Sequence, residues 1–216
     1  MIRTCFLFTL FSAYWAGSAV IADNLIKNGD FAVVAENGTV EGWTADKFEQ
    51  KLVKDTGDKP EGVAQSLRLD IGKAAKGHGQ IYQGFRDLKK DTTYVLEGKL
   101  KSSAAGLAYF QIKLYSNDKT QGKNGELSRT DAPKGKSTAE WQPISYEFST
   151  GKSDKVLILL RFLQEESAVG KSAWFADIKL TEKAAPVAEA KPVEAEKPTE
   201  VAKPPEAEKP AEKPAE

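Results

Sequence analysis

The chain carries few of the side chains from which catalytic sites are built. Its 216 residues include one histidine, His78, and one cysteine, Cys5. A histidine–zinc cluster requires several such ligands, which excludes it. A Cys–His nucleophile pair requires both residue types in one site, and it is excluded because Cys5 lies in the predicted signal peptide. Ser–His–Asp catalysis would have to use His78, which lies between two glycines in a predicted turn, and the sequence contains no nucleophile elbow.

Paired carboxylates are the remaining route to catalysis, because two Asp or Glu side chains about 5 to 9 Å apart suffice for glycoside hydrolysis. The acidic residues occur mostly in predicted turns and near the C-terminus, and no acidic cluster lies on one strand face. We therefore expect no enzyme activity in this chain. The alternative is an accessory role in a glycoside hydrolase system.

Tyrosine and amide side chains alternate along one predicted strand, residues 108–115, and favour ligand binding instead. Tyr109, Gln111, Lys113 and Tyr115 share one face of this strand because side chains alternate with a period of two. A sugar presents flat C–H patches beside hydroxyl groups, which aromatic rings and planar polar side chains can contact. The competing interpretation is an ordinary solvated sheet face. The candidate ligand-binding residues are Tyr109, Gln111, Tyr115, Lys113, Tyr82 and Trp141.

Short strands must position these residues, and no convincing helix is present. Strands are predicted at 66–71, 80–85, 92–101, 108–115, 144–148, 156–162 and 174–181. Turn sequences separate them, which predicts an all-β fold, a two-sheet β-sandwich or jelly roll. In the last strand, Trp174, Ala176, Ile178 and Leu180 are expected to share a face.

The polar segment 117–140 is longer than an ordinary connection and is either functional or mobile at one rim of the sheets. Trp141 closes this segment and is a candidate for either core packing or ligand contact. Trp43 and Trp174 are expected in the core.

The N-terminal residues 1–22 have the anatomy of a secretory signal peptide. Arg3 precedes an apolar run, and Val20-Ile21-Ala22 precedes the expected cleavage site. An uncleaved membrane anchor is the alternative. Cleavage would leave a mature chain without cysteine, and hence without disulfides.

The C-terminal residues 184–216 form a Lys-Pro/Glu-Ala repeat with seven prolines and no aromatic residue. Such a composition cannot build a core, so we expect a disordered tail. The tail is either an inert solubilising segment or a spacer that reaches an envelope or protein partner. A single folded domain is expected between the two ends, at residues 23–183.

Charge argues against nucleic acid as a partner. The tail holds eight Glu and five Lys and the signal segment holds one Arg, which leaves 25 basic and 23 acidic residues in the domain. A domain that grips phosphates requires a clear basic excess.

The motifs at the two ends of the domain identify a family resemblance. Residues 28–31, Asn-Gly-Asp-Phe, and residues 175–178, Phe-Ala-Asp-Ile, flank Tyr82-Gln83 and Trp141 in an order that resembles carbohydrate-binding modules of the four/nine type. This resemblance implies a galactose-binding-like jelly roll that binds β-glucan or xylan chains across one sheet.

The resemblance also implies a structural calcium, for which Asp30 and Asp177 are the candidates; no other cofactor is expected. Two positions that are usually acidic in the family are Ala32 and Ala176 here. Calcium requires six to eight oxygen ligands, several of them from carboxylates.

The sequence therefore predicts an exported, monomeric, non-catalytic module that binds polysaccharide and resides in the periplasm, the cell envelope or outside the cell. The alternative is a structural or protein-interaction domain of the envelope that keeps the fold without a sugar site.

Overall fold

The computed structural model describes residues 23–46, 50–75, 78–133 and 136–184. The predicted signal peptide and the tail beyond residue 184 lie outside the described residues. Within the described ranges, no helix has the length and apolar character needed to cross a membrane.

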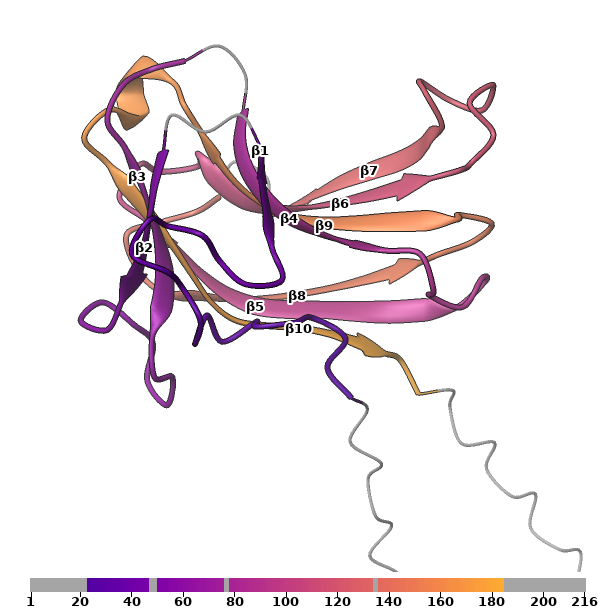
Figure 1. The fold of residues 1–216 in the computed structure, drawn as a ribbon, viewed down its shortest axis with the longest axis horizontal. Helices are drawn as coiled ribbons and strands as arrows, with labels where there is room; N and C mark the ends of the chain where they lie inside the picture. The colour runs from indigo at the N-terminus through magenta and orange to yellow at the C-terminus, as the bar shows by residue number, and fades with distance from the viewer. Residues whose placement is uncertain (1–22, 47–49, 76–77, 134–135, 185–216) are drawn as a thin grey trace, which may run out of the picture. The chain divides into compact units, whose positions relative to one another are not determined.

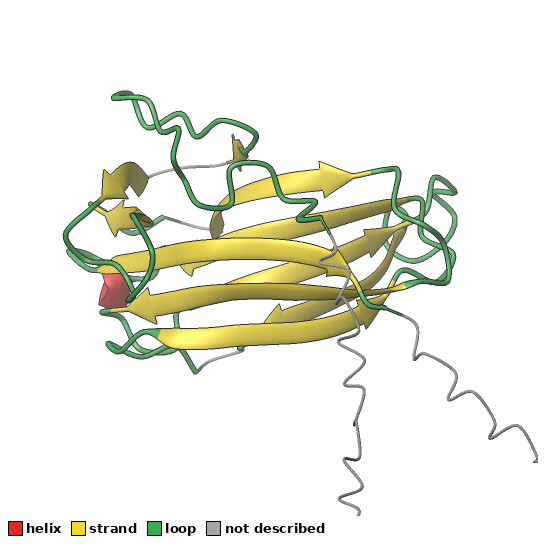
Figure 2. Ribbon diagram, turned by 90° about the horizontal axis from the view of Figure 1, so that it is seen from below, coloured by secondary structure: helices red, strands yellow, loops and turns green. Residues whose placement is uncertain are grey.

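Two antiparallel five-stranded sheets pack against each other in the described part of the chain (Figures 1 and 2). The first sheet contains, in spatial order, β1 (Thr44–Asp46), β4 (His78–Phe85), β9 (Lys155–Leu163), β6 (Ala108–Tyr115) and β7 (Glu126–Ala132). The second contains β2 (Gln50–Asp55), β3 (Ser66–Ile71), β10 (Ser172–Glu182), β5 (Thr93–Ser102) and β8 (Gln142–Ser149). One short 3-10 helix, Glu166–Ala168, precedes β10. The predicted all-β sandwich is confirmed.

The core lies between the two sheets and is built from alternate residues of each strand. Phe110 of β6 meets Phe175 of β10 edge to face, with ring centroids 5.5 Å apart, and both side chains are fully buried. Trp43 is also buried and packs near Phe31, as predicted for a core tryptophan. Burial of each large apolar side chain contributes about 1.5–3 kcal/mol, so this layer holds the sheets together.

The N-terminal segment closes the domain by pairing with β10. The backbone N–H of Leu25 donates to the carbonyl of Leu180 at 2.9 Å. The Asn24 side chain donates to the carbonyl of Ile178 and accepts from the N–H of Leu180. The N–H of Ile178 donates to the carbonyl of Gly29. Bonds from Asn24, Leu25 and Gly29 therefore secure the first residues of the domain to its last strand.

A bulge in β10 changes which of its side chains face the core. The pairing register with β5 shifts between Ala176 and Lys179, and Asp177 has a φ of 53°. The extra residue shifts the alternation by one. Phe175 and Ile178 are both in the core, whereas Trp174 lies on the outer side of the sheet. The predictions that Trp174 is a core residue and shares a face with Ile178 and Leu180 are therefore wrong.

On the outer side of the second sheet, the indole of Trp174 is held by a carboxylate. Its Nε1 donates to Asp55 Oδ2 at 3.0 Å, and Arg68 donates to the same oxygen at 3.1 Å. The backbone N–H groups of Gly57 and Asp58 donate to Asp55 Oδ1. Burial alone would raise the pKa of Asp55, but these donors together lower it below its usual 3.8.

We expect Gly29→Ala to destabilise the domain, because a Cβ at this position would clash with the carbonyl oxygen of Ile178. Forcing backbone apart in this way costs about 2–3 kcal/mol. Urea denaturation followed by tryptophan fluorescence measures this cost. The control is Gly72→Ala, whose Cβ would enter open space. Equal unfolding midpoints for the two variants would contradict this account of the Asn-Gly motif.

Asp55 should make the stability of the domain depend on pH. A carboxyl whose pKa is lower in the folded state stabilises the fold above its unfolded pKa, and this stabilisation is lost as the pH falls through the folded pKa. At neutral pH we expect Asp55→Asn to cost about 1–2 kcal/mol. Between about pH 5 and pH 3, the parent should lose more stability than the variant does. Denaturant titrations across this range test it, and parallel pH curves would refute it.

Candidate functional site

The outer face of the first sheet contains most of the residues predicted to bind ligand. The strands bring its side chains together in four cross-strand rows. In order along the sheet, the rows are Gln80–Arg161–Tyr109, then Thr44–Tyr82–Leu159–Gln111–Asp131, then Gly84–Leu157–Lys113–Arg129, and finally Lys155–Tyr115–Glu126. We call these residues the outer face. In Figure 1 the edge strand β7, beyond β6, turns away from the second sheet.

Two of the predicted contact residues are buried, although they point away from the core. Tyr109 is 7% exposed and Gln111 is 1% exposed. Leu159 and Arg161, beside them on β9, are equally enclosed. The prediction of an exposed row is therefore wrong for Tyr109 and Gln111.

A buried chain of polar contacts runs across this part of the outer face. Arg161 Nη1 donates to Gln111 Oε1 at 2.8 Å, and Gln111 Nε2 donates to Asp131 Oδ1 at 2.6 Å. The Arg161 guanidinium also lies 5.7 Å over the ring of Tyr109. Burial raises the pKa of the Tyr109 phenol and lowers the pKa of Arg161. These four side chains form a rigid floor, which we call the polar floor.

Tyr115 and Lys113 are half-buried at the other end of the outer face. The hydroxyl of Tyr115 donates to Glu126 Oε2 at 3.1 Å, and Lys155 Nζ lies 5.9 Å from the centre of the Tyr115 ring. Arg129 pairs with Glu126 at 2.8 Å, and Lys113 is 3.6 Å from the same carboxylate. Burial alone would raise the pKa of Glu126, but Lys113 and the other donors hold it below its usual value.

Tyr82 is the second half-buried aromatic residue of the outer face. It lies on β4, two strands from β6, and two rows along the sheet from the row that contains Tyr115. Strand spacing and residue rise place the Cα atoms of Tyr82 and Tyr115 roughly 16 Å apart. Two rings at this spacing can contact separate units of an extended ligand.

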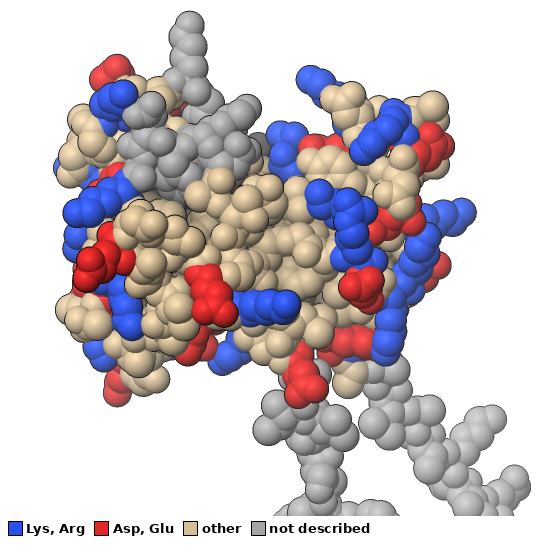
Figure 3. All heavy atoms as spheres, in the orientation of Figure 1, with Lys and Arg blue, Asp and Glu red and all other residues tan. Residues whose placement is uncertain are grey.

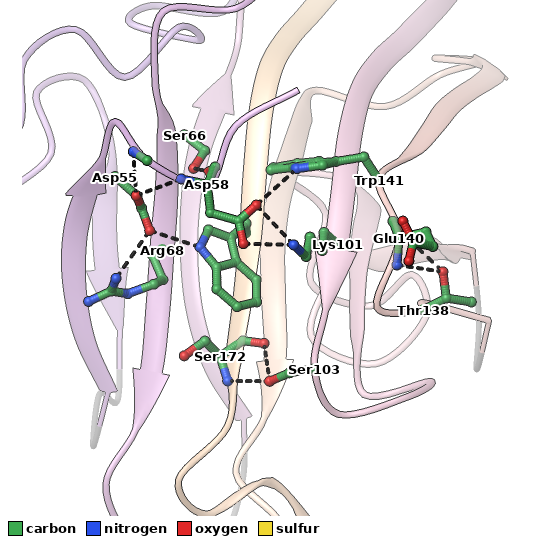
Figure 4. Close-up of polar contacts among 12 residues, drawn as sticks. Asp55, Asp58, Ser66, Arg68, Lys101, Ser103, Thr138, Glu140, Trp141 and Ser172 are labelled. Carbon is green, nitrogen blue, oxygen red and sulfur yellow. Dashed lines mark hydrogen bonds and ion pairs between the residues drawn. The ribbon is translucent and has the colours of Figure 1, made fainter. Parts of the chain in front are cut away.

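Trp141, the remaining predicted contact residue, lies on the opposite sheet. Its indole Nε1 donates to Asp58 Oδ1 at 3.2 Å, and Lys101 of β5 pairs with Asp58 at 2.7 Å (Figure 4). Lys101 in turn lies 5.1 Å from the centre of the Trp174 ring. The structure therefore separates Trp141 from the tyrosines of the outer face and uses it to hold the loop that carries Asp58.

Sequence reasoning missed β7 and the charged residues that it contributes. The strand lies inside the polar segment 117–140, where the sequence predicted a connection. Its outer-face residue Glu126 is the partner of Tyr115 and Lys113, and Asp131 is the partner of Gln111. Arg129, on the same face, pairs with Glu126. An edge strand of polar residues has no hydrophobic alternation, so the only signal was the run 126–132 without glycine or proline. His78, predicted in a turn, begins β4.

The candidate calcium residues do not fit the ion. The Asp177 carboxylate pairs with Lys179 at 2.9 Å, and the Asp30 carboxylate accepts from the N–H of Ala32. The carbonyl of Asp30 accepts from Gln65. Among the described residues, no three histidine, cysteine or acidic side chains are grouped as metal ligands would be. A calcium site would need more free oxygens than this region offers.

Comparison with solved structures shows the fold class of the sandwich. The CBM22-1 xylan-binding domain from Paenibacillus barcinonensis Xyn10C superposes with a TM-score of 0.52 at 16% identity, covering 76% of this chain and 97% of that domain. A putative sugar-binding protein from Bacteroides thetaiotaomicron gives a TM-score of 0.50 at 14% identity, with 74% and 100% coverage.

The enzymatically active domain of tailspike protein 4 of bacteriophage CBA120 gives a TM-score of 0.53 at 11% identity. The match covers 74% of this chain but only 21% of that protein. A search of curated proteins finds no significant match.

Comparison with protein families matches residues 23–168 to a family described as a carbohydrate binding domain. The match spans most of the sandwich and includes β4, β6, β7 and β9, which form most of the outer face. The resemblance read from the sequence motifs is confirmed. This chain therefore belongs to the carbohydrate binding domain family of the four/nine type.

Proposed function

We propose that the chain is an exported, non-catalytic module that binds a β-glucan or xylan type of polysaccharide on the outer face of the first sheet. The observation that carries this proposal is the pair of half-buried rings, Tyr82 and Tyr115, which lie on the same sheet face as the polar floor. Aromatic rings fixed at such a spacing suit the C–H faces of successive sugars. Family membership and the fold shared with a xylan-binding domain support it.

The buried residues serve the site differently from the exposed ones. Tyr82, Tyr115 and Lys113 reach solvent and would contact the sugar. Tyr109 and Gln111 are enclosed, so they would position the rings and strands rather than touch ligand. Trp141 would contribute to stability through Asp58 rather than to binding.

The carboxylates of the outer face favour binding over hydrolysis. A glycosidase needs a general acid whose pKa is raised. Glu126 has a lowered pKa because Lys113, Tyr115 and Arg129 stabilise its charged form. Asp131 is hydrogen-bonded to the amide of Gln111. Neither arrangement prepares a carboxyl to protonate a leaving sugar.

The rest of the chain would deliver the module to its glycan. The predicted signal peptide, residues 1–22, would export it to the periplasm, the cell envelope or the medium. The predicted tail, residues 184–216, would act as a spacer towards an envelope or protein partner. We propose that the folded domain, residues 23–183, works as a monomer.

A second candidate, a structural or interaction domain of the envelope, is favoured by one observation. The floor residues Arg161, Gln111 and Asp131 are linked by hydrogen bonds to one another, as in a face that needs no ligand. Such a domain would keep the fold and show no affinity for polysaccharide.

We expect Tyr82→Ala and Tyr115→Ala each to weaken binding to β-glucan or xylan by about 1 kcal/mol, which is roughly fivefold in Kd, because each loses a stacking ring. Affinity electrophoresis in gels that contain the polysaccharides measures this directly. Tyr82→Phe and Tyr115→Phe retain the rings and should bind more tightly than the alanine variants.

The matched control is Ser145→Ala, an exposed position of β8 on the second sheet, which should bind as the parent does. Urea denaturation establishes that every variant is folded. If the parent chain is not retarded by any neutral β-glucan or xylan, the binding proposal fails and the structural candidate replaces it.

A further inference from the structure

Positive charge exceeds negative charge on the outer face. Its cations are Lys113, Arg129, Lys155 and Arg161. Among the outer-face side chains that the structure describes, the carboxylates are Glu126 and Asp131. Asp46 shares the far end of the face through its register with Gln80, and its side chain lies outside the described residues. The excess is therefore concentrated at the end that carries Tyr115.

The two carboxylates are already shared among several donors. Glu126 accepts the hydroxyl of Tyr115 at 3.1 Å, pairs with Arg129 at 2.8 Å and lies 3.6 Å from Lys113. One negative charge thus serves two cations and a hydroxyl. Because two cations depend on one carboxylate, part of the positive charge at this end has no counter-charge.

In the polar floor, the guanidinium of Arg161 is also incompletely paired. Asp131 reaches Arg161 only through the neutral amide of Gln111. Arg161 is 4% exposed, and its Nε is buried with no hydrogen-bond partner. A buried guanidinium in this arrangement is stabilised by any anion that approaches the face.

The protonation equilibria agree with this picture. Burial lowers the pKa of Lys113, and repulsion from Arg129 lowers it further despite the nearby Glu126. Burial likewise lowers the pKa of Arg161, although Tyr109 and Asp131 offset part of the effect. Burial is thus the main cause of both shifts, and repulsion from Arg129 contributes to the one at Lys113.

Neighbouring loops extend the positive region beyond the strands. Lys119 and Lys123 lie in the connection between β6 and β7, and Lys152 precedes β9; all three are exposed. Asp118 and Asp154, the carboxylates of these loops, each accept backbone and side-chain donors close by. In Figure 3 many Lys and Arg side chains, with Asp and Glu among them, lie at the right-hand end, towards which β6, β7 and β9 extend in Figure 1.

We propose that the Tyr115 end of the outer face selects polysaccharides that carry carboxylate groups, such as uronic acid units on a xylan or glucan backbone. This inference rests on the proposed function and names its ligand class more narrowly. A sugar ring would contact Tyr115 while its carboxylate neutralises Lys113, Arg129 and Lys155. The near balance of 25 basic and 23 acidic residues across residues 23–183 makes this a local property.

The test compares glucuronoxylan with the same polymer after its carboxyl groups are reduced to alcohols, so that only charge differs. In affinity electrophoresis at low salt, the full chain should bind the acidic form about fivefold more tightly or better. The preference should shrink at about 0.5 M salt, where exposed charges are screened. The double variant Arg129→Gln/Lys155→Gln should reduce it, whereas Lys51→Gln, exposed on β2 of the other sheet, should retain it.

The outcomes separate the two proposals. Equal binding of the acidic and reduced polymers would overturn the inference and leave the proposed function intact. Binding of neither polymer, nor of neutral β-glucan, would overturn both. Equally tight binding of sulfated xylan or duplex DNA would also overturn it, because it would show a general attraction to polyanions rather than selection of a carboxylated sugar.

Discussion

The pairing register between β6 and β9 is the constraint on which the site depends. Phe110 and Ile112 of β6 point into the core. Because side chains alternate along a strand, the side chains of Tyr109, Gln111, Lys113 and Tyr115 must point outward. A slip of one residue would bury the polar set and expose the phenylalanine, so the core fixes the composition of the outer face. The 2.8 Å hydrogen bond from Arg161 to Gln111 and the edge-to-face contact of Phe110 with Phe175 secure the same register from opposite sides of the sheet.

A buried arginine is an unusual component for the outer side of a sheet, and its environment explains why it is tolerated. Removal of the Arg161 guanidinium from water is costly. The Tyr109 ring and the amide of Gln111 offset part of that cost. Asp131 supplies a negative charge that is linked to Arg161 through the amide of Gln111. The result is a face that is rigid before any ligand arrives, which reduces the ordering cost of binding.

Much of the fold could be predicted because its physical signals are local. The alternation of residues 108–115 placed β6 and both its faces correctly. The bulge at Asp177 could not be predicted, because it depends on contacts of Ile178 with the distant Gly29. An uninterrupted strand alternation therefore assigned Trp174 to the wrong face of the sheet.

The solvent exposure of the predicted site residues could not be predicted from the sequence, for a related reason. Alternation says that Tyr109 and Gln111 leave the core, but whether they reach water depends on neighbours from β9 and β7, and β7 itself lacks a recognisable pattern. Trp141 illustrates the same limit, since its partner Asp58 comes from a loop 83 residues away.

The two sheets use charged groups for opposite purposes. On the second sheet, Asp55 and Asp58 each pair an indole N–H with a cation, so the tryptophans and their neighbours are satisfied within the domain (Figure 4). On the first sheet, Glu126 is outnumbered by cations and Arg161 lacks a direct counter-ion. Paired groups of the first kind stabilise a fold, whereas an uncompensated excess is best neutralised by something from outside. That difference argues for recognition on the first sheet and a structural role for the second.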